Sequence, residues 1–127
     1  MAFKVLAVDY IAKDGLEYLR EKGCEVDVLA DDEAKNLISI IEPYDAILVR
    51  SRTHITREIL DAAPHLKIIG RAGVSIDSID VAAATERGII VCNAPQSNII
   101  SAAEMTMALM LTCARKIPCA NESLKRG

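Results

Sequence analysis

Aromatic residues are scarce in this sequence: its 127 residues include no Trp, three Tyr and one Phe. Proteins that bind single-stranded nucleic acids stack the bases on aromatic side chains, and proteins that bind duplexes usually carry a basic surface. This chain has 15 basic and 18 acidic residues, and thus a net charge of −3. The two shortages together argue against a nucleic acid as the partner.

Long uncharged apolar stretches are also missing. The longest one covers residues 105–114, whereas a helix that crosses a bilayer needs about 20 such residues. The amino terminus shows no charged leader followed by an apolar stretch, so we expect neither a secretory signal nor a membrane partner. Hydrophobic residues nevertheless make up 51% of the chain, which excludes general disorder and is enough for the core of one domain.

The four cysteines have no CxxC spacing, so we expect neither a zinc site nor a redox pair. Because no export signal is found, they are interpreted as reduced thiols of a cytoplasmic protein. We expect Cys24, Cys92 and Cys113 to be small residues of the hydrophobic core.

Three motifs of nucleotide binding or nucleophilic catalysis are absent as well. No GxGxxG follows an apolar run, and neither GxxxxGKS/T nor GxSxG occurs. These 127 residues therefore contain no glycine-rich turn of the kind that holds a nucleotide phosphate.

Strand-like and helix-like segments alternate along the chain. This alternation is typical of a parallel sheet with crossover helices, and we predict an α/β fold with a flavodoxin-like five-stranded sheet in the order 2-1-3-4-5. The predicted strands cover residues 4–8, 25–29, 46–49, 66–69 and 89–92, and the predicted helices cover 14–22, 32–41, 56–63 and 80–87. The second helix is expected to be capped by Asp31 or Asp32 and the third by Thr56.

The character of the sequence changes after the fifth predicted strand. Ser101 and Glu104 have the spacing of a capping box, which predicts a long helix from Ser101 to about residue 117. Its middle is apolar on all sides, so we expect it to be covered on more than one side. A more polar helix follows at 120–126. We expect the sheet domain to cover residues 1–98 and the helices at 99–127 to follow it.

Polar residues follow three of the predicted strands. The carboxyl ends of parallel strands share one edge of the sheet, where open α/β folds bind ligands. Two guanidinium groups and free backbone amides at that edge would suit a carboxylate or a phosphate, and an amide side chain would add a neutral hydrogen bond. The candidate residues are Arg50 and Ser51, then Arg71 with the amides of Ala72 and Gly73, and finally Asn93.

Other interpretations of these residues stay open. Arg71 alternatively pairs with Asp77 or Asp80, and Gly73 serves an ordinary turn. Asp9, directly after the first strand, is expected to act as a cap or a hydrogen-bonding residue. His54 and His65 are placed in surface loops, where a structural or solvent-facing role is expected rather than that of a general base.

Three segments together resemble one enzyme family. They read AILVRSRTHIT at 46–56, LKIIGRAGVSIDSIDVAAATERGIIVCNAP at 66–95 and SNIISAAEMTMALMLTCARKIP at 97–118. The chain resembles the amino-terminal part of the D-isomer-specific 2-hydroxyacid dehydrogenases over essentially all of its residues. The resemblance implies a flavodoxin-like substrate domain at 1–98, followed at 99–127 by an interdomain helix and the incomplete start of a Rossmann domain that binds NAD, in a homo-oligomeric enzyme. Its members oxidise a small anionic 2-hydroxy acid by hydride transfer, and related members use glyoxylate, hydroxypyruvate, lactate or formate.

The same resemblance implies roles for individual residues. Arg50 and Ser51 would lie near a substrate phosphate, and Asn93 would face the substrate. Arg71, with Ala72 and Gly73 beside it, would hold the substrate carboxylate. Val74 and Thr106 would approach the nicotinamide end of NAD.

Two departures from the family pattern stand out. Ser75 and Ser78 occupy positions where the family usually has Gly and Asn, and Ser75 would be strained if its φ were positive. The family's GxGxxG turn and its catalytic Arg, Glu and His lie beyond residue 127, so we expect this chain alone to be inactive and to bind NAD weakly. The open alternative is a non-catalytic binding or dimerisation module that uses the apolar helix.

Overall fold

The computed structural model describes residues 2–29 and 36–127. It divides into two compact units, Met1–Pro95 and Gln96–Gly127. The expected cap of the second helix at Asp31 or Asp32 lies outside the described residues.

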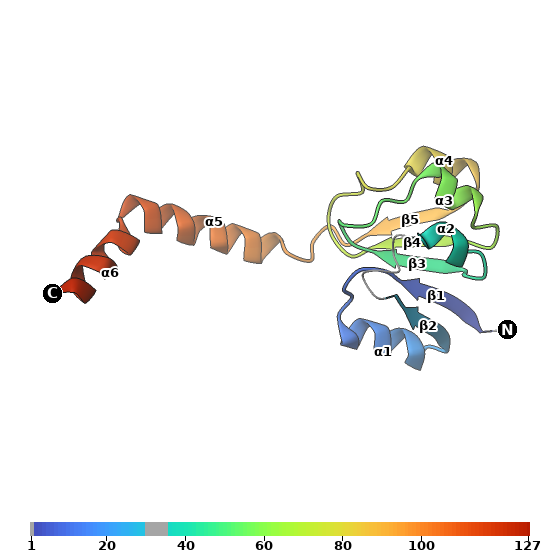
Figure 1. The fold of residues 1–127 in the computed structure, drawn as a ribbon, viewed down its shortest axis with the longest axis horizontal. Coiled ribbons are helices and arrows are strands. Elements are labelled where there is room, and N and C mark those ends of the chain that lie inside the picture. Colours follow the sequence, from blue (N-terminus) through green and yellow to red (C-terminus); the bar gives the residue numbers. More distant parts are fainter. Residues whose placement is uncertain (1, 30–35) are drawn as a thin grey trace. The chain divides into compact units, whose positions relative to one another are not determined.

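The first unit is built on a parallel sheet of five strands (Figure 1). Their order is β2-β1-β3-β4-β5, which confirms the predicted flavodoxin-like arrangement. The strands are β1 (Phe3–Ala7), β2 (Cys24–Val28), β3 (Ala46–Val49), β4 (Ile68–Arg71) and β5 (Ile90–Asn93).

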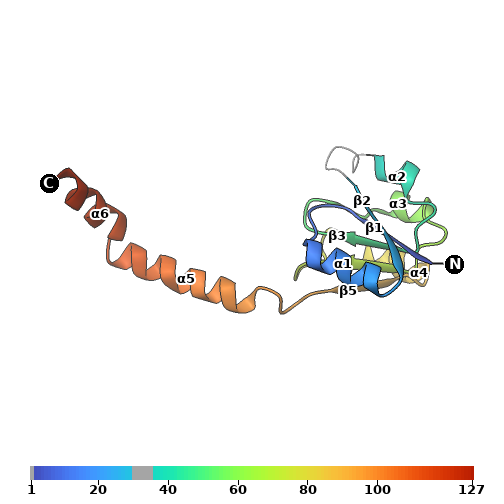
Figure 2. The same ribbon diagram turned by 90° about the horizontal axis from the view of Figure 1, so that it is seen from below.

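Four helices cover the two faces of this sheet. Helix α1 lies on one face, and α2, α3 and α4 lie on the other (Figures 1 and 2). Their bounds are α1 (Lys13–Glu21), α2 (Leu37–Ile40), α3 (Arg57–Asp61) and α4 (Val81–Glu86). Helix α4 begins where Asp80 Oδ1 accepts a hydrogen bond from the Ala83 amide at 2.8 Å, and Gly88 follows it with a φ of +70°.

Successive side chains along each strand point to opposite faces of the sheet, and the hydrophobic core therefore has two parts. Leu6, Ile47 and Ile69 are fully buried under α2–α4, whereas their neighbours Val5 and Ala46 face α1. Each fully buried Leu or Ile side chain contributes about 1.5–3 kcal/mol. A sheet that is buried on both faces over its central strands therefore explains why β3 is a continuous apolar run.

Strand β4 extends further than the sequence pattern predicted. The predicted strand ended at residue 69, but Gly70 pairs with Leu48 and Cys92, and Arg71 ends the strand. A Cβ on Gly70 would lie 2.6 Å from Leu48 Cδ2. The glycine therefore makes room for a neighbouring side chain, and it does not break the strand.

Two further local expectations were wrong. Thr56 stands at the start of α3, but its side chain makes no capping hydrogen bond. Cys24 is half-buried, whereas Cys92 and Cys113 are exposed and do not belong to the core. Cys92 is exposed because β5 is an edge strand, in which Ile90 is also 61% exposed.

The second unit consists of α5 (Ile99–Ala114) and α6 (Ile117–Arg126). The predicted capping box was wrong, because α5 already begins at Ile99 and so contains Ser101 and Glu104. Lys116 has a φ of +50° and separates the two helices, and Pro118 lies in the first turn of α6. None of the side chains of α5 is buried. Among the described residues no helix is both long and apolar enough to cross a membrane.

Tyr44 gives the first unit an alkaline pH dependence. Burial, together with the hydrogen bond that its hydroxyl donates to Asp27 Oδ2 at 2.9 Å, raises the pKa of Tyr44 from 10.0 to about 12. The unfolded chain therefore loses this proton at a lower pH than the folded chain. The corresponding stability is fully present below pH 10 and is lost as the pH rises to about 12.

We expect Tyr44→Phe to remove this part of the pH dependence, as measured by urea unfolding midpoints on both sides of pH 10. Asp27→Asn keeps the burial but removes the charged acceptor, so it should narrow the pH range over which stability falls. An equally steep alkaline loss in Tyr44→Phe would contradict the assignment to this hydroxyl.

Candidate functional site

The candidate residues lie at the carboxyl edge of the sheet. Val49 pairs with Arg71, and Arg71 pairs with Asn93, so the last residues of β3, β4 and β5 stand in one row. Arg50 follows β3 directly. The register thus brings two arginines and one amide side chain to the same edge, as the sequence predicted.

Arg71 is a half-buried cation that folds back on its own loop. Its Nη1 donates to Ala72 O at 3.3 Å, while its buried Nε has no hydrogen-bond partner. A Cβ on Gly73 would lie 1.8 Å from Nη1, so the guanidinium group lies directly against the glycine. The glycine at the end of the sequence GRAG (residues 70–73) therefore has a steric role, because Gly73 leaves the space that the Arg71 side chain occupies.

The alternative ion pairs of Arg71 are absent from the described structure. Asp77 accepts a hydrogen bond from the Ser75 hydroxyl at 2.7 Å, and Asp80 caps α4. No described acidic residue forms a salt bridge with Arg71. Its charge is therefore uncompensated at the edge where a ligand would enter.

Two of the three expected free amides are in use. The Ala72 amide donates to Val49 O at 2.8 Å, and the Gly73 amide donates to Arg71 O at 2.9 Å. The expectation that they are available to an anion was wrong, because β4 pairs with β3 up to its last residue and the loop turns tightly after it. Within the described residues the Ser51 amide makes no hydrogen bond.

Asn93 holds the loop that follows β4. Its Nδ2 donates to Val74 O at 2.6 Å, and the neighbouring Ala94 amide donates to Gly73 O at 3.0 Å. The end of β5 is thus joined to residues 73–74 by two hydrogen bonds. Val74, between them, is 46% exposed.

The loop after β3 is held by residues of the segment between β1 and α1. The Arg50 amide donates to Asp9 Oδ2 at 2.8 Å, the Thr53 hydroxyl donates to Asp9 Oδ1 at 3.0 Å, and Arg50 Nη1 approaches Tyr10 O at 3.4 Å. The expected hydrogen-bonding role of Asp9 is therefore confirmed. The part played by Thr53 was missed, and the only signal for it was a small hydroxyl residue close behind two arginines.

The two guanidinium groups contact different loops. Arg50 reaches the loop between β1 and α1, and Arg71 lies on the loop after β4. Thr106 belongs to α5 in the second unit, where its hydroxyl donates to Ala102 O at 2.7 Å. Arg50 and Arg71 thus belong to the same edge of the sheet, but each guanidinium group contacts a different loop.

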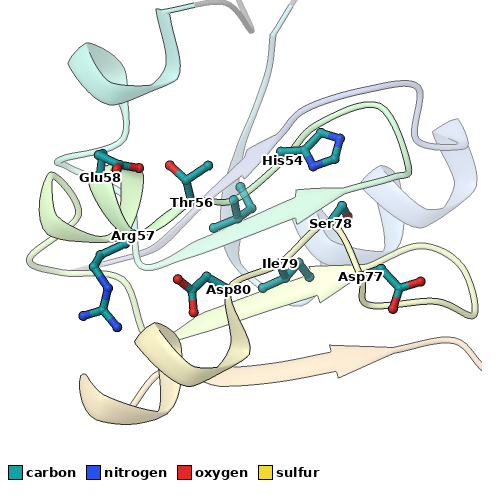
Figure 3. A pocket seen from close by; sticks show the side chains of 9 residues that line it. His54, Thr56, Arg57, Glu58, Asp77, Ser78, Ile79 and Asp80 are labelled. Carbon is teal, nitrogen blue, oxygen red and sulfur yellow. The ribbon is translucent and has the colours of Figure 1, made fainter.

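A pocket of about 450 Å³ lies between the loops that lead into α3 and α4 (Figure 3). The two loops pair in parallel at Ile55 and Ile79, whose side chains are buried. Their exposed or half-buried neighbours, among them His54 and Ser78, line the pocket. Ser78 does not cap a helix, and its buried Oγ has no hydrogen-bond partner.

The charged groups around this pocket are compensated locally. Arg57 forms hydrogen bonds of 2.7 and 3.3 Å with Glu86, which raise the pKa of Arg57 and lower the pKa of Glu86. Hydrogen bonds from Thr56 and from its own backbone amide lower the pKa of Glu58. The described residues contain no group of three His, Cys, Asp or Glu side chains suited to a metal ion.

Ser75 fits its position without strain. The described non-glycine residues with positive φ are Asp9 and Lys116, so Ser75 does not require the freedom of a glycine. Its hydroxyl also accepts a hydrogen bond from the Asp77 amide at 3.1 Å, which closes a small turn.

Residues 5–126 match the family model described as "D-isomer specific 2-hydroxyacid dehydrogenase, catalytic domain". The chain belongs to this family. A D-3-phosphoglycerate dehydrogenase from Archaeoglobus fulgidus is 50% identical over 124 residues, which are 98% of this chain and 24% of the relative. The chain therefore spans about a quarter of the length of the curated relative that it matches.

Solved structures of similar proteins agree with this family. A protein from Thermus thermophilus is 31% identical with a TM-score of 0.85, over 98% of this chain and 41% of the other. A 3-phosphoglycerate dehydrogenase from Entamoeba histolytica, crystallised with NAD+, is 29% identical with a TM-score of 0.77, over 88% and 39% of the two chains.

In this chain, Gly73→Ala should move the Arg71 guanidinium group with little effect on stability. The added Cβ takes the place of Nη1, but Gly73 is not among the positive-φ glycines, so we expect the free energy of unfolding to change by less than about 1 kcal/mol. The Nε–Hε NMR resonance of Arg71 and urea unfolding measure the two effects. Gly15→Ala in α1, where the nearest atom to an added Cβ lies at 4.0 Å, is the matched control and should leave the Arg71 resonance in place.

Proposed function

We propose that this chain is the substrate-binding part of an NAD-dependent D-3-phosphoglycerate dehydrogenase, which oxidises 3-phosphoglycerate to 3-phosphohydroxypyruvate at the entry to serine synthesis. The family and the 50% identical relative of that name support this choice of substrate. Four free cysteines also favour a cytoplasmic location. A homo-oligomer is part of the proposal, because apolar side chains of α5 such as Met105 and Leu109 are exposed.

The uncompensated guanidinium group of Arg71 is the observation that carries the proposal. Its Nε lacks a partner, and its Nη1 makes only a long hydrogen bond to a carbonyl. A buried donor without a partner is costly, and a carboxylate satisfies a guanidinium group with paired hydrogen bonds. In the proposed complex, Arg71 therefore holds the substrate carboxylate at the carboxyl edge of β4.

The remaining candidate residues are assigned to other parts of the substrate. Arg50 and the unengaged Ser51 amide receive the phosphate. Asn93 keeps the loop at residues 73–74 in place and contributes to the wall that faces the substrate. Together these groups bind and orient a small molecule with an anion at each end.

Two residues are proposed for the nicotinamide end of NAD. Val74 offers an apolar side chain that is 46% exposed, and Thr106 in the second unit is the second candidate. When bound, NAD accepts a hydride from the substrate. The sequence contains no glycine-rich turn for the pyrophosphate.

Substrate binding is testable by NMR titration of the 127-residue chain with 3-phosphoglycerate. We expect the amide resonances of residues 50–51, 71–74 and 93 to shift. Arg71→Gln should weaken the affinity by roughly 10- to 100-fold, because it removes charge-assisted hydrogen bonds worth about 1.5–3 kcal/mol. Arg126→Gln in α6 removes the same charge elsewhere and should leave the affinity unchanged.

D-Glycerate, glyoxylate and formate are titrated in the same way, and their affinities are compared with that of 3-phosphoglycerate. Tighter binding of 3-phosphoglycerate than of D-glycerate supports the phosphorylated substrate. Equal affinity for both would favour another 2-hydroxy acid of the family. Resonance shifts confined to residues outside the carboxyl edge would contradict the site itself.

Catalysis is testable with a chimera. This chain replaces the matching segment of the Archaeoglobus fulgidus dehydrogenase, and NADH absorbance follows the oxidation of 3-phosphoglycerate. We expect the chimera to retain activity within about tenfold of its parent, a cost of no more than about 1.4 kcal/mol. The 127-residue chain alone should produce no NADH, because it contains no glycine-rich turn for the cofactor.

The chimera with Arg71→Gln is the control for the site, and it should lose activity while remaining folded. A folded chimera that reduces NAD with another 2-hydroxy acid but not with 3-phosphoglycerate would refute the proposed substrate. Turnover by the 127-residue chain alone would refute its proposed role as a binding part.

A further inference from the structure

Asp9 is a buried residue with an unusual backbone conformation at the carboxyl edge. It lies two residues after the end of β1, it is 8% exposed, and its φ is +67°. Residues with a Cβ seldom adopt this left-handed conformation, although Asp tolerates it better than most. Backbone strain of this kind persists only where the surrounding structure enforces it.

The loop after β3 supplies the interactions that enforce it. Asp9 Oδ2 accepts from the Arg50 amide at 2.8 Å, and Asp9 Oδ1 accepts from the Thr53 hydroxyl at 3.0 Å. Thr53 is as deeply buried as Asp9, at 8% exposure. These partners lie 41 and 44 positions away in the sequence, so the carboxylate joins two distant segments and does not form a local turn.

The two hydrogen bonds enclose the residues that would meet an anion. Arg50 and Ser51 are exposed, and the bonds to Asp9 hold the chain on both sides of them. A buried carboxylate requires hydrogen-bond donors, and here an N–H and an O–H of the loop provide them. The position of the loop is therefore set by Asp9.

We infer that Asp9 is a positioning residue for the phosphate of the substrate. It holds residues 50–53 so that the Arg50 side chain and the Ser51 amide face the same anion. Asp9 does not itself touch the phosphate, because its negative charge would repel it and both of its oxygens are engaged. The inference rests on the proposed function, which gives the phosphate to Arg50 and Ser51. Because Asp9 already orders the loop in the free protein, ligand binding does not have to pay the entropic cost of ordering it.

The test compares two ligands that differ only in the phosphate. The affinities of 3-phosphoglycerate and D-glycerate are measured by NMR titration of the 127-residue chain and of Asp9→Asn, which places an NH2 group against one of the two donors. We expect 3-phosphoglycerate to bind about tenfold more weakly to Asp9→Asn, and D-glycerate to change by less than about twofold. A merely structural role would weaken both ligands alike or neither.

A second pair of variants keeps the test decisive if Asp9→Asn does not fold. Thr53→Val preserves the shape of the side chain and removes its hydroxyl, so it should cause the same selective loss for 3-phosphoglycerate. Thr53→Ser keeps the hydroxyl and should behave like the wild type. Thermal unfolding of each variant checks that it is folded.

A double variant tests whether Asp9 affects phosphate binding through Arg50. If Asp9 acts through the loop, Asp9→Asn should cause little further loss when Arg50→Gln has already removed the guanidinium group, since residues in one network are not additive.

Unchanged binding of 3-phosphoglycerate in both Asp9→Asn and Thr53→Val would overturn this inference and leave the proposed function intact. Equal losses for the two ligands would also overturn it. No binding of 3-phosphoglycerate by the wild-type chain would overturn the proposed function, and this inference with it.

Discussion

The parallel register of β3, β4 and β5 is the constraint on which the candidate site depends. Because Val49, Arg71 and Asn93 are paired across three neighbouring strands, residues distant in the sequence reach the same edge. Backbone hydrogen bonds along the strands set this alignment, and the buried side chains on both faces hold it. A shift by one residue would send each of these side chains to the opposite face of the sheet.

Polar side chains at strand ends then position the loops that carry the site. Asp9 holds the loop after β3 through two donors, and Asn93 holds the loop after β4 through the Val74 carbonyl. In both cases the residue that anchors a loop lies at or near the end of a different strand. Arg50 is thus presented by an ordered loop and Arg71 by the end of β4, and this is the preorganisation that an anion site requires.

Much of the fold was predictable from local pattern. The alternation of strands and helices predicted the five-stranded parallel sheet, whereas the order of its strands was predicted from the orders that are common among such folds. The bounds of β3 matched at both ends because a short apolar run is bracketed by Asp45 and Arg50. Strand β4 was misjudged at Gly70, because a glycine inside a strand and a glycine in a turn look alike in sequence. The start of α5 was misplaced because a capping-box spacing also occurs inside a helix.

The candidate site was predictable in its residues but not in its contacts. The position of each residue directly after an apolar run identified Arg50, Arg71 and Asn93. Which amides are free, which carbonyl Asn93 holds and where the Arg71 guanidinium group lies depend on neighbours that are remote in sequence.

By itself, the sequence determined the class of fold and the edge of the sheet at which the polar residues gather, because apolar periodicity and strand ends are local properties, and the resemblance of three segments identified the family. Only the tertiary structure decided that Asp9 binds the loop after β3 and that Gly73 makes room for Arg71. Both are contacts across space, and hydrogen-bond geometry and the volume of side chains settle them once the strands are paired.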